Sequence, residues 1–204
     1  MNMRLFYLVW MMLATSVCWA EPVINAQSPQ STEALFVDYV LGEEYASSVT
    51  KAIPLVIEEG LSAGWLVTIN SVEECTADLV QDEKNPDKKL MEAVQDFCAK
   101  NSQASTIDAI GPLTVKHIVM TKTQMDELFA DQGDGWDKFY QLYPESPGII
   151  TLSRPGFSAD ETLAVIYIGN QSHWLAGHGG IRIYRKKDGK WVDEREGLGP
   201  SWVS

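Results

Sequence analysis

The chain has few basic residues, few cysteines and few histidines, and each shortage argues against a class of protein. It holds 16 Lys and Arg against 28 Asp and Glu, which gives a formal net charge of −12 at pH 7. A surface this acidic repels phosphate backbones and anionic lipid headgroups, so we expect no nucleic-acid partner. No apolar run after residue 20 is as long as a membrane span. We therefore expect no stable membrane insertion of the chain that follows residue 20.

A recognisable catalytic motif is also missing. Ser153 lies in LSRPGF rather than in a G-x-S-x-G elbow. A triad of Ser153 or Ser172, His173 or His178, and Asp160 would form only if folding brought these residues together. The alternative is that the hydroxyls are bonded to the backbone of turns. The two histidines do not match a strong zinc motif, and we expect no cofactor.

Residues 1–20 are typical of a secretory signal peptide. Arg4 precedes an apolar core, and Cys18 and Ala20 occupy the positions of a small-x-small cleavage site before Glu21. The alternative is a retained membrane anchor, for which the apolar run is short. Residues 21–31 contain two prolines and small polar residues, which indicates a flexible leader. We therefore expect a periplasmic or secreted protein.

Cleavage would leave two cysteines, Cys75 and Cys98, in an oxidising compartment. An even count favours a disulfide bond between them, with two free buried thiols as the alternative. Zinc is the weaker choice because no histidine lies near this pair in the sequence. On the chain-entropy model, closing a loop of about two dozen residues contributes roughly 3 kcal/mol of stability.

The order of the predicted elements indicates an α+β domain over residues 32–204, with a mainly antiparallel sheet packed against a few helices and a strand-rich C-terminal half. Apolar spacing predicts helices after Thr32, after Asn85-Pro86 and near Trp136, and a capping arrangement of Thr123 with Asp126 predicts a further short helix. Residues 70–84 are polar and acidic and are expected to form a loop. The predicted strands cover residues 53–58 (an edge or an irregular start, because of Pro54), 65–69, 113–120, 149–153, 162–168, 181–185 and a return strand from 191.

The segment from Gly169 to Gly180 is the best candidate for a site, because it is predicted to be a long glycine-rich loop at one end of the sheet. We name His173, Trp174 and His178 from this segment as candidate ligand-binding residues. With His117 the two histidines could also hold a metal ion, but we favour the alternative, a long hairpin connection whose glycines set the turn and whose histidines are solvated. Arg154 could bind an anion, or it could pair with a nearby acidic residue. The four aromatic residues of a short helix could line a pocket, but helical spacing favours the core: Trp136, Phe139, Tyr140 and Tyr143.

The C-terminal part resembles a family of uncharacterised secreted bacterial proteins over roughly residues 113–204. The words that carry the resemblance are GWDKFYQLYPESPGIITLSRPGF (135–157), LAVIYIGNQ (163–171), LAGHGG (175–180), DGKW (188–191) and the final SWVS. The resemblance implies a fold and export from the cell, and it implies no activity. We therefore expect a non-catalytic binding or accessory module of the bacterial envelope, with an unknown protein or small molecule as its partner. The alternative is a small hydrolase or metal-dependent enzyme that uses His173 and His178.

Overall fold

The computed structural model describes residues 30–64, 69–130 and 133–204, with the backbone alone at 195 and 196. The predicted signal peptide, most of the predicted leader, and most of the strand predicted at 65–69 lie outside the described residues. Within the described ranges, no helix is long and apolar enough to cross a membrane.

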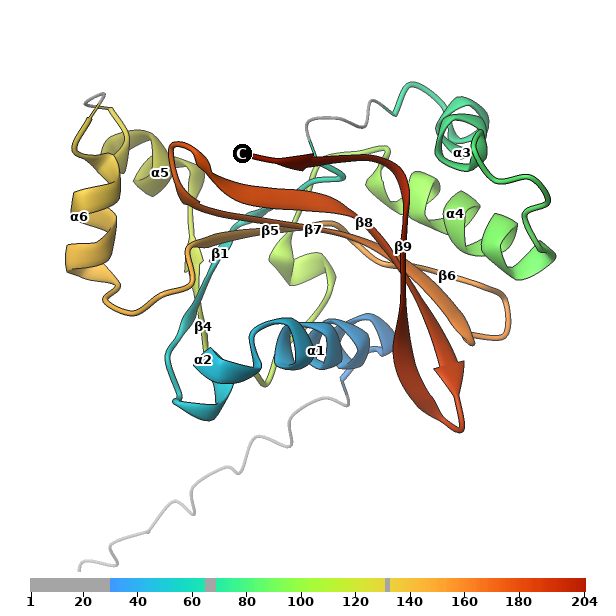
Figure 1. The fold of residues 1–204 in the computed structure, drawn as a ribbon, viewed down its shortest axis with the longest axis horizontal. Coiled ribbons are helices and arrows are strands. Elements are labelled where there is room, and N and C mark those ends of the chain that lie inside the picture. The colour runs from blue at the N-terminus through green and yellow to red at the C-terminus, as the bar shows by residue number, and fades with distance from the viewer. Residues whose placement is uncertain (1–29, 65–68, 131–132) are drawn as a thin grey trace, which may run out of the picture.

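A seven-stranded sheet forms the centre of the molecule (Figure 1). Its strands lie side by side in the order β4-β1-β5-β7-β8-β9, and β6 pairs with β7 beyond the end of β5. The strands are β1 (Leu55–Glu58), β4 (His117–Met120), β5 (Ile149–Leu152), β6 (Gly156–Phe157), β7 (Leu163–His173), β8 (Ala176–Lys187) and β9 (Lys190–Val203). A separate antiparallel pair is formed by β2 (Gly60–Leu61) and β3 (Ser105–Thr106).

The α+β class is confirmed, and so is the strand-rich C-terminal half. The strands β5 to β9 pair with one another only in the antiparallel direction. The pairing of β1 differs from the expectation, because this strand runs parallel to both of its neighbours, β4 and β5. The prediction that Pro54 makes this strand an edge is therefore wrong. Pro54 lies just before the first residue of β1, so its missing N–H removes no hydrogen bond from the ladder.

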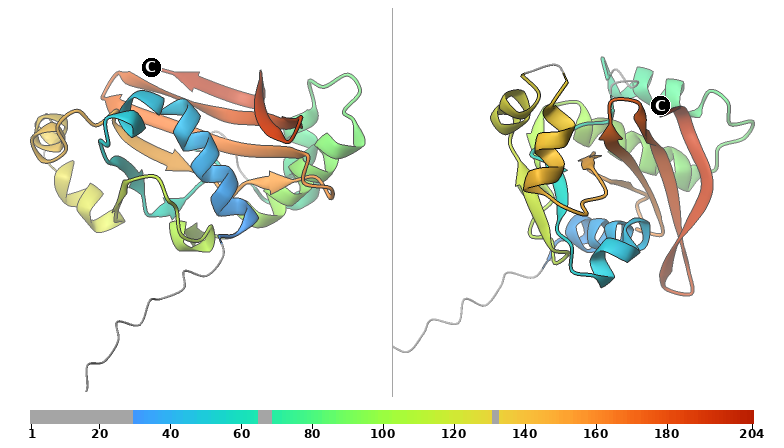
Figure 2. Two further views of the ribbon diagram at one scale, coloured as in Figure 1. Left: turned by 90° about the horizontal axis from the view of Figure 1, so that it is seen from below. Right: turned by 60° about the vertical axis from the view of Figure 1, so that its left-hand side comes forward.

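Helices cover both faces of the sheet (Figure 2). One face carries α1 and the short α2, and the other carries α3 and α4 at one end and α5 and α6 at the other (Figure 1). The helices are α1 (Thr32–Glu44), α2 (Ala46–Thr50), α3 (Val72–Val80), α4 (Lys88–Asn101), α5 (Lys122–Leu128) and α6 (Gly135–Leu142), with a 3-10 turn at Ile107–Ala109.

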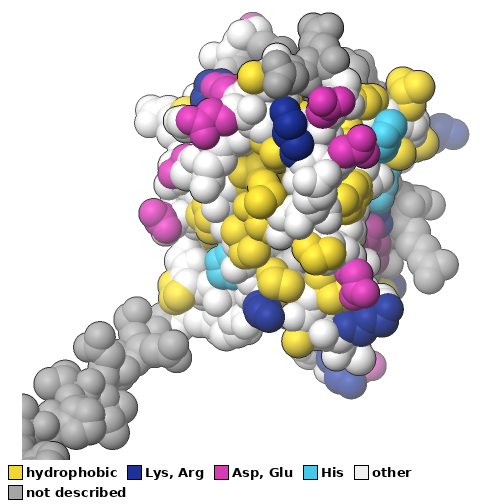
Figure 3. Space-filling model, turned by 90° about the vertical axis from the view of Figure 1, so that its left-hand side faces the viewer, with side chains coloured by type: hydrophobic (Ala, Val, Ile, Leu, Met, Phe, Trp, Pro, Cys, Tyr) yellow, Lys and Arg dark blue, Asp and Glu magenta, His cyan; other side chains and the backbone are white. Residues whose placement is uncertain are grey.

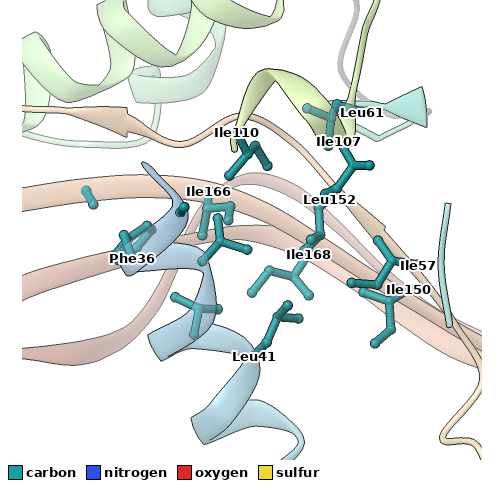
Figure 4. Close-up of a cluster of buried hydrophobic side chains, with 14 of the residues drawn as sticks. Phe36, Leu41, Ile57, Leu61, Ile107, Ile110, Ile150, Leu152, Ile166 and Ile168 are labelled. Carbon is teal, nitrogen blue, oxygen red and sulfur yellow. The ribbon is translucent and has the colours of Figure 1, made fainter. Parts of the chain in front are cut away.

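Alternate residues of each strand separate the two faces. Ile57 belongs to the core under α1, whereas its neighbour Val56 packs against α6 on the opposite face. The α1 core is built from Phe36 and Leu41 of the helix and isoleucines of β1, β5 and β7 (Figure 4). Since side chains alternate along a strand, this register fixes which residues can meet on the α3–α6 side.

The expected loop at residues 70–84 is wrong, because residues 72–80 form α3. Ser71 caps this helix: its hydroxyl accepts a hydrogen bond from the backbone N–H of Glu74 at 3.1 Å. Glu73 and Glu74 occupy the first turn, where carboxylates interact favourably with the helix dipole. The acidic run therefore marks a helix start, and not a solvated loop.

The Cys75–Cys98 disulfide is present and joins α3 to α4, with 6.0 Å between the two Cα atoms. Both cysteines are buried. The bridge therefore fastens one helix to another, where the sequence had predicted a link between a helix and a loop.

Two predicted helix starts are displaced by a few residues. The cap of α4 is Asp87, whose side chain accepts from the N–H of Leu90 at 2.8 Å, and not Asn85. The cap of α5 is Thr121, which forms a reciprocal capping box with Gln124. Both helices were correctly predicted, α4 from its apolar spacing and α5 from a capping arrangement.

Candidate ligand-binding groove

Among the described residues, no helix packs on the strip of the sheet between the α3–α4 pair and the α5–α6 pair. At one end α5 and α6 pack on Val56, Met120 and Ile149. At the other end α3 and α4 pack on the β7–β8 part of the sheet, through residues such as Leu163 and Val165. Between these two clusters, side chains of β1, β5 and β7 form the floor of a groove.

The groove contains two adjoining cavities of about 390 Å³ and about 440 Å³. Four residues line both of them: Glu58, Thr151, Gln171 and Trp174. Each volume lies in the range of small-molecule sites in proteins. The shared lining makes the two cavities parts of one groove.

Glu58 lies at the floor of the groove, as the last residue of β1. The hydroxyl of Thr151 donates a hydrogen bond to its Oε2 atom at 3.0 Å. Burial raises the pKa of Glu58, and the hydrogen bond from Thr151 lowers it by less. Among the described residues, no basic side chain pairs with this carboxyl group and no donor reaches its Oε1 atom. A carboxyl group desolvated in a cleft without a cationic partner is a common mark of a functional site.

Aromatic rings form one wall of the groove. Trp174, at the tip of the β7–β8 hairpin, meets Phe129 edge-to-face with 5.6 Å between ring centroids. Phe129 in turn meets Trp136 of α6 at 5.1 Å. Trp136 is buried, as expected for a core residue, but it also lines the cavity that holds Glu58. Trp174 is 42% exposed, so part of its ring is available to a ligand.

The packing of the opposite wall explains why several positions of the β7–β8 hairpin are glycine. The indole N–H of Trp202 donates to the hydroxyl of Tyr167 at 3.0 Å, and both residues line the second cavity. A Cβ atom at Gly179 would lie 2.6 Å from that hydroxyl and would also overlap the Trp202 ring. Gly169 is crowded by the Tyr167 side chain, and Gly177 by the Trp202 ring and the backbone of Asn170. These glycines leave space for aromatic side chains on the surface of the sheet.

The prediction that residues 169–180 form a long loop is therefore wrong. The segment is the end of a β-hairpin, in which β7 and β8 pair up to His173 and Ala176 and only Trp174 and Leu175 form the turn. The glycines are strand residues, and a pattern that suggested a flexible connection reflects close packing across the sheet.

The structure separates the predicted histidines. His173 stacks on Trp136, with 6.4 Å between ring centroids, on the side of α6. His178 lies on the α1 side, where its Nε2 atom is 3.8 Å from Glu44 Oε1. His117 begins β4 and bonds to the carbonyl of Val115. In the described part of the chain, no group of three or more His, Cys, Asp or Glu residues is arranged to hold a metal ion.

Arg154 lies outside the groove and pairs with an acidic residue. Its guanidinium donates to both carboxylate oxygens of Glu33, at 2.8 Å and 3.1 Å. Glu33 also binds Lys100 at 3.2 Å. The hydrogen bonds from Arg154 to Glu33 raise the pKa of the guanidinium. This network joins α1, α4 and the end of β5.

Both serines considered for a catalytic triad form hydrogen bonds with backbone groups. Ser153 is fully buried and accepts a hydrogen bond from the N–H of Tyr167 at 2.9 Å. Ser172 donates to the carbonyl of Ala176 at 3.1 Å. Asp160 lies in a turn, where Lys89, Thr162 and Ser158 lower its pKa. Among the described residues, neither serine hydroxyl is hydrogen-bonded to His173 or His178.

A further cavity of about 400 Å³ lies among β4, α5 and α6. Apolar side chains gather on the side of the molecule that these elements form (Figure 3). The lining includes Met120, Leu128 and Leu142. Its polar lining comes from side chains such as Gln124, Glu127 and Lys138.

Comparisons with known proteins found no match among family models, curated proteins or solved structures. The arguments about the groove therefore depend on its own residues.

The sequence predicted Trp174, which lines the groove, and His173, which stacks on the lining residue Trp136, but Glu58, Thr151 and Gln171 were not predicted. A signal for Glu58 is present, because this acidic residue ends an otherwise apolar strand and is followed by Glu59 and Gly60. The partners of Glu58 come from strands about 90 residues later in the chain, and only the sheet order brings them together.

Proposed function

We propose that this chain is an exported, non-catalytic binding module of the bacterial envelope, periplasmic or secreted, which takes a small ligand or a partner's side chain into the groove over Glu58. The observation that carries the proposal is a carboxyl group without a basic partner on the floor of two joined cavities, beside a partly exposed tryptophan. Pockets that combine an apolar lining with a few polar groups are the usual sites of small-molecule binding.

Export is supported by the signal-like N-terminus and by the buried Cys75–Cys98 disulfide, which is compatible with an oxidising compartment. The likeness of residues 113–204 to secreted bacterial proteins points in the same direction. A non-catalytic role fits the placement of the polar groups, because the described nucleophiles are bonded to the backbone and the histidines lie apart.

A ligand screen by NMR tests the proposal. A library of amines, carboxylates, amino acids and sugars is added to the ¹⁵N-labelled mature protein, and the Trp174→Phe variant assigns the indole signal of Trp174. We expect at least one compound to shift the Trp174 indole and the Gln171 side-chain amide together. If no compound shifts either signal, or if all shifts map outside the groove, the proposed function is wrong.

A further inference from the structure

Resting on that function, we propose that the groove recognises a primary ammonium group on a short apolar stem, with the ammonium nitrogen at Glu58 and the stem against Trp174. The argument depends on three features of the lining: its charge, its hydrogen-bonding groups and its aromatic wall.

The charge of the lining is negative. Glu58 and Asp126 line the groove, and no Lys or Arg is among the described residues that line either cavity. Asp126 already has a partner at the rim, Lys122, at 2.9 Å, and both side chains are mostly exposed. Glu58 has no such partner in the part of the chain that the structure describes, so a ligand cation would supply the missing positive charge. An anionic ligand would meet an unpaired carboxylate instead.

The floor of the groove is rich in hydrogen-bond acceptors. Glu58 Oε1 has no donor among the described residues. The Thr151 hydroxyl donates its hydrogen bond to Glu58, and its oxygen lone pairs can still accept one. One side-chain amide N–H of Gln171 donates to the carbonyl of His173 at 3.5 Å, and among the described residues no donor is bonded to its amide oxygen. An ammonium group has three donors and no acceptor, so it complements these three groups.

The aromatic wall also favours a cation. The faces of Trp and Phe rings carry negative electrostatic potential and attract ammonium groups. Trp174 and Phe129 lie beside the cavity that holds Glu58, and Met125 and Ile149 add apolar surface for a stem. A cavity of about 390 Å³ accommodates a stem of a few carbon atoms. A quaternary ammonium group has no N–H donors, so it would leave the acceptors of the floor unpaired.

The test is an NMR titration of the mature protein at pH 7 with n-butylamine, which is protonated at this pH. 1-Butanol and tetramethylammonium serve as the neutral and the quaternary probe, butyrate as the anion, and glucose as the carbohydrate. We expect n-butylammonium to bind in the millimolar range and to shift the signals of Trp174 and Gln171. The other probes should bind about tenfold more weakly or not at all, since a charge-assisted hydrogen bond to a partly buried carboxylate contributes at least this factor.

Two matched variants complete the test. Glu58→Gln should weaken n-butylammonium binding by about tenfold or more while 1-butanol binding is unchanged. Glu59→Gln removes the neighbouring carboxylate, which does not line the groove, and should bind like the parent. The amide spectrum of each variant verifies the fold. If 1-butanol, glucose or tetramethylammonium binds the groove as well as n-butylammonium does, or if Glu58→Gln changes nothing, the groove remains a binding site and the ammonium inference is overturned. If no compound of any class shifts the groove signals, both proposals fail.

Discussion

The indole N–H of Trp202 donates a hydrogen bond to the hydroxyl of Tyr167, 3.0 Å away, across the surface of β8. Tyr167 lies in the middle of β7 and Trp202 near the end of β9, and their side chains meet over Gly179, which pairs with Trp202 in the ladder. This contact forms one wall of the groove, and it can form only because Gly179 has no side chain.

Replacing Gly179 by Ala should therefore destabilise the protein, by about 1–3 kcal/mol, because the new Cβ atom would overlap the Trp202 ring and the Tyr167 hydroxyl. Urea unfolding followed by circular dichroism measures the change. Gly42→Ala is the control: nothing lies within 4 Å of that position in α1, and Ala is the better helix former. Equal stability of Gly179→Ala and the parent would show that the wall is not packed as described.

The disulfide should stabilise the link between α3 and α4. Replacing both Cys75 and Cys98 by Ser should lower the free energy of unfolding by roughly 3 kcal/mol, because the unfolded chain is no longer closed into a loop. Thermal unfolding with and without reductant measures this, and the reduced parent should unfold close to the variant. If the double substitution lowers the stability by the same amount with and without reductant, the result contradicts the disulfide bond.

The Glu33 network should be structural. Glu33 is largely buried and binds both Arg154 and Lys100, so Glu33→Gln removes the carboxylate partner of Arg154 and leaves Lys100 with Asp96 alone. We expect a loss of about 1–3 kcal/mol in the free energy of unfolding.

Arg154→Met should lower stability in the same direction and should leave n-butylammonium binding unchanged, since Arg154 does not line the groove. A changed affinity of Arg154→Met for n-butylammonium would show that Arg154 contributes to the ligand site, as the sequence had predicted.

Glu58 should make the stability of the protein fall as the pH rises. Its pKa is raised in the folded protein by burial, so the unfolded chain loses this proton at a lower pH than the folded protein does. Below the ordinary value of 4.5 both states hold the proton and Glu58 adds no pH dependence. Between that pH and the raised pKa, ionisation favours the unfolded state, and above the raised pKa the penalty is constant.

The Glu58→Gln variant should lack this contribution. Urea unfolding of the parent and of Glu58→Gln is measured between pH 4 and pH 8. As the pH rises, the free energy of unfolding of the variant should increase relative to that of the parent. A difference between the two proteins that does not change with pH would mean that the Glu58 pKa is ordinary in the folded state.

Much of the fold could be predicted, because local patterns determine it. The apolar spacing of α4 and α6, the turn at Asp188-Gly189 and the β-rich runs of β5 and β7 all indicate the observed elements. The helix α3 was missed because its acidic first turn resembles a solvated loop when the Ser71 cap is not recognised. The central position of β1 was missed because pairing between distant parallel strands leaves no local signal.

The site was less predictable than the fold. Trp174 and His173 were found because glycines and histidines drew attention to their segment, yet the glycines serve to accommodate Trp202 and Tyr167. Glu58, Thr151 and Gln171 belong to three separate strands, and their proximity follows from the order β1-β5-β7. A reading of single segments could not combine them.

The pKa of Glu58, measured by ¹³C NMR of its side-chain carboxyl group with and without n-butylamine, tests the account most directly. The account predicts a pKa above 4.5 in the free protein, because the carboxyl group is buried without a cation, and a clear fall when the ammonium group binds. An ordinary pKa in the free protein that does not move on addition of the amine would contradict both the environment assigned to Glu58 and the ligand assigned to the groove.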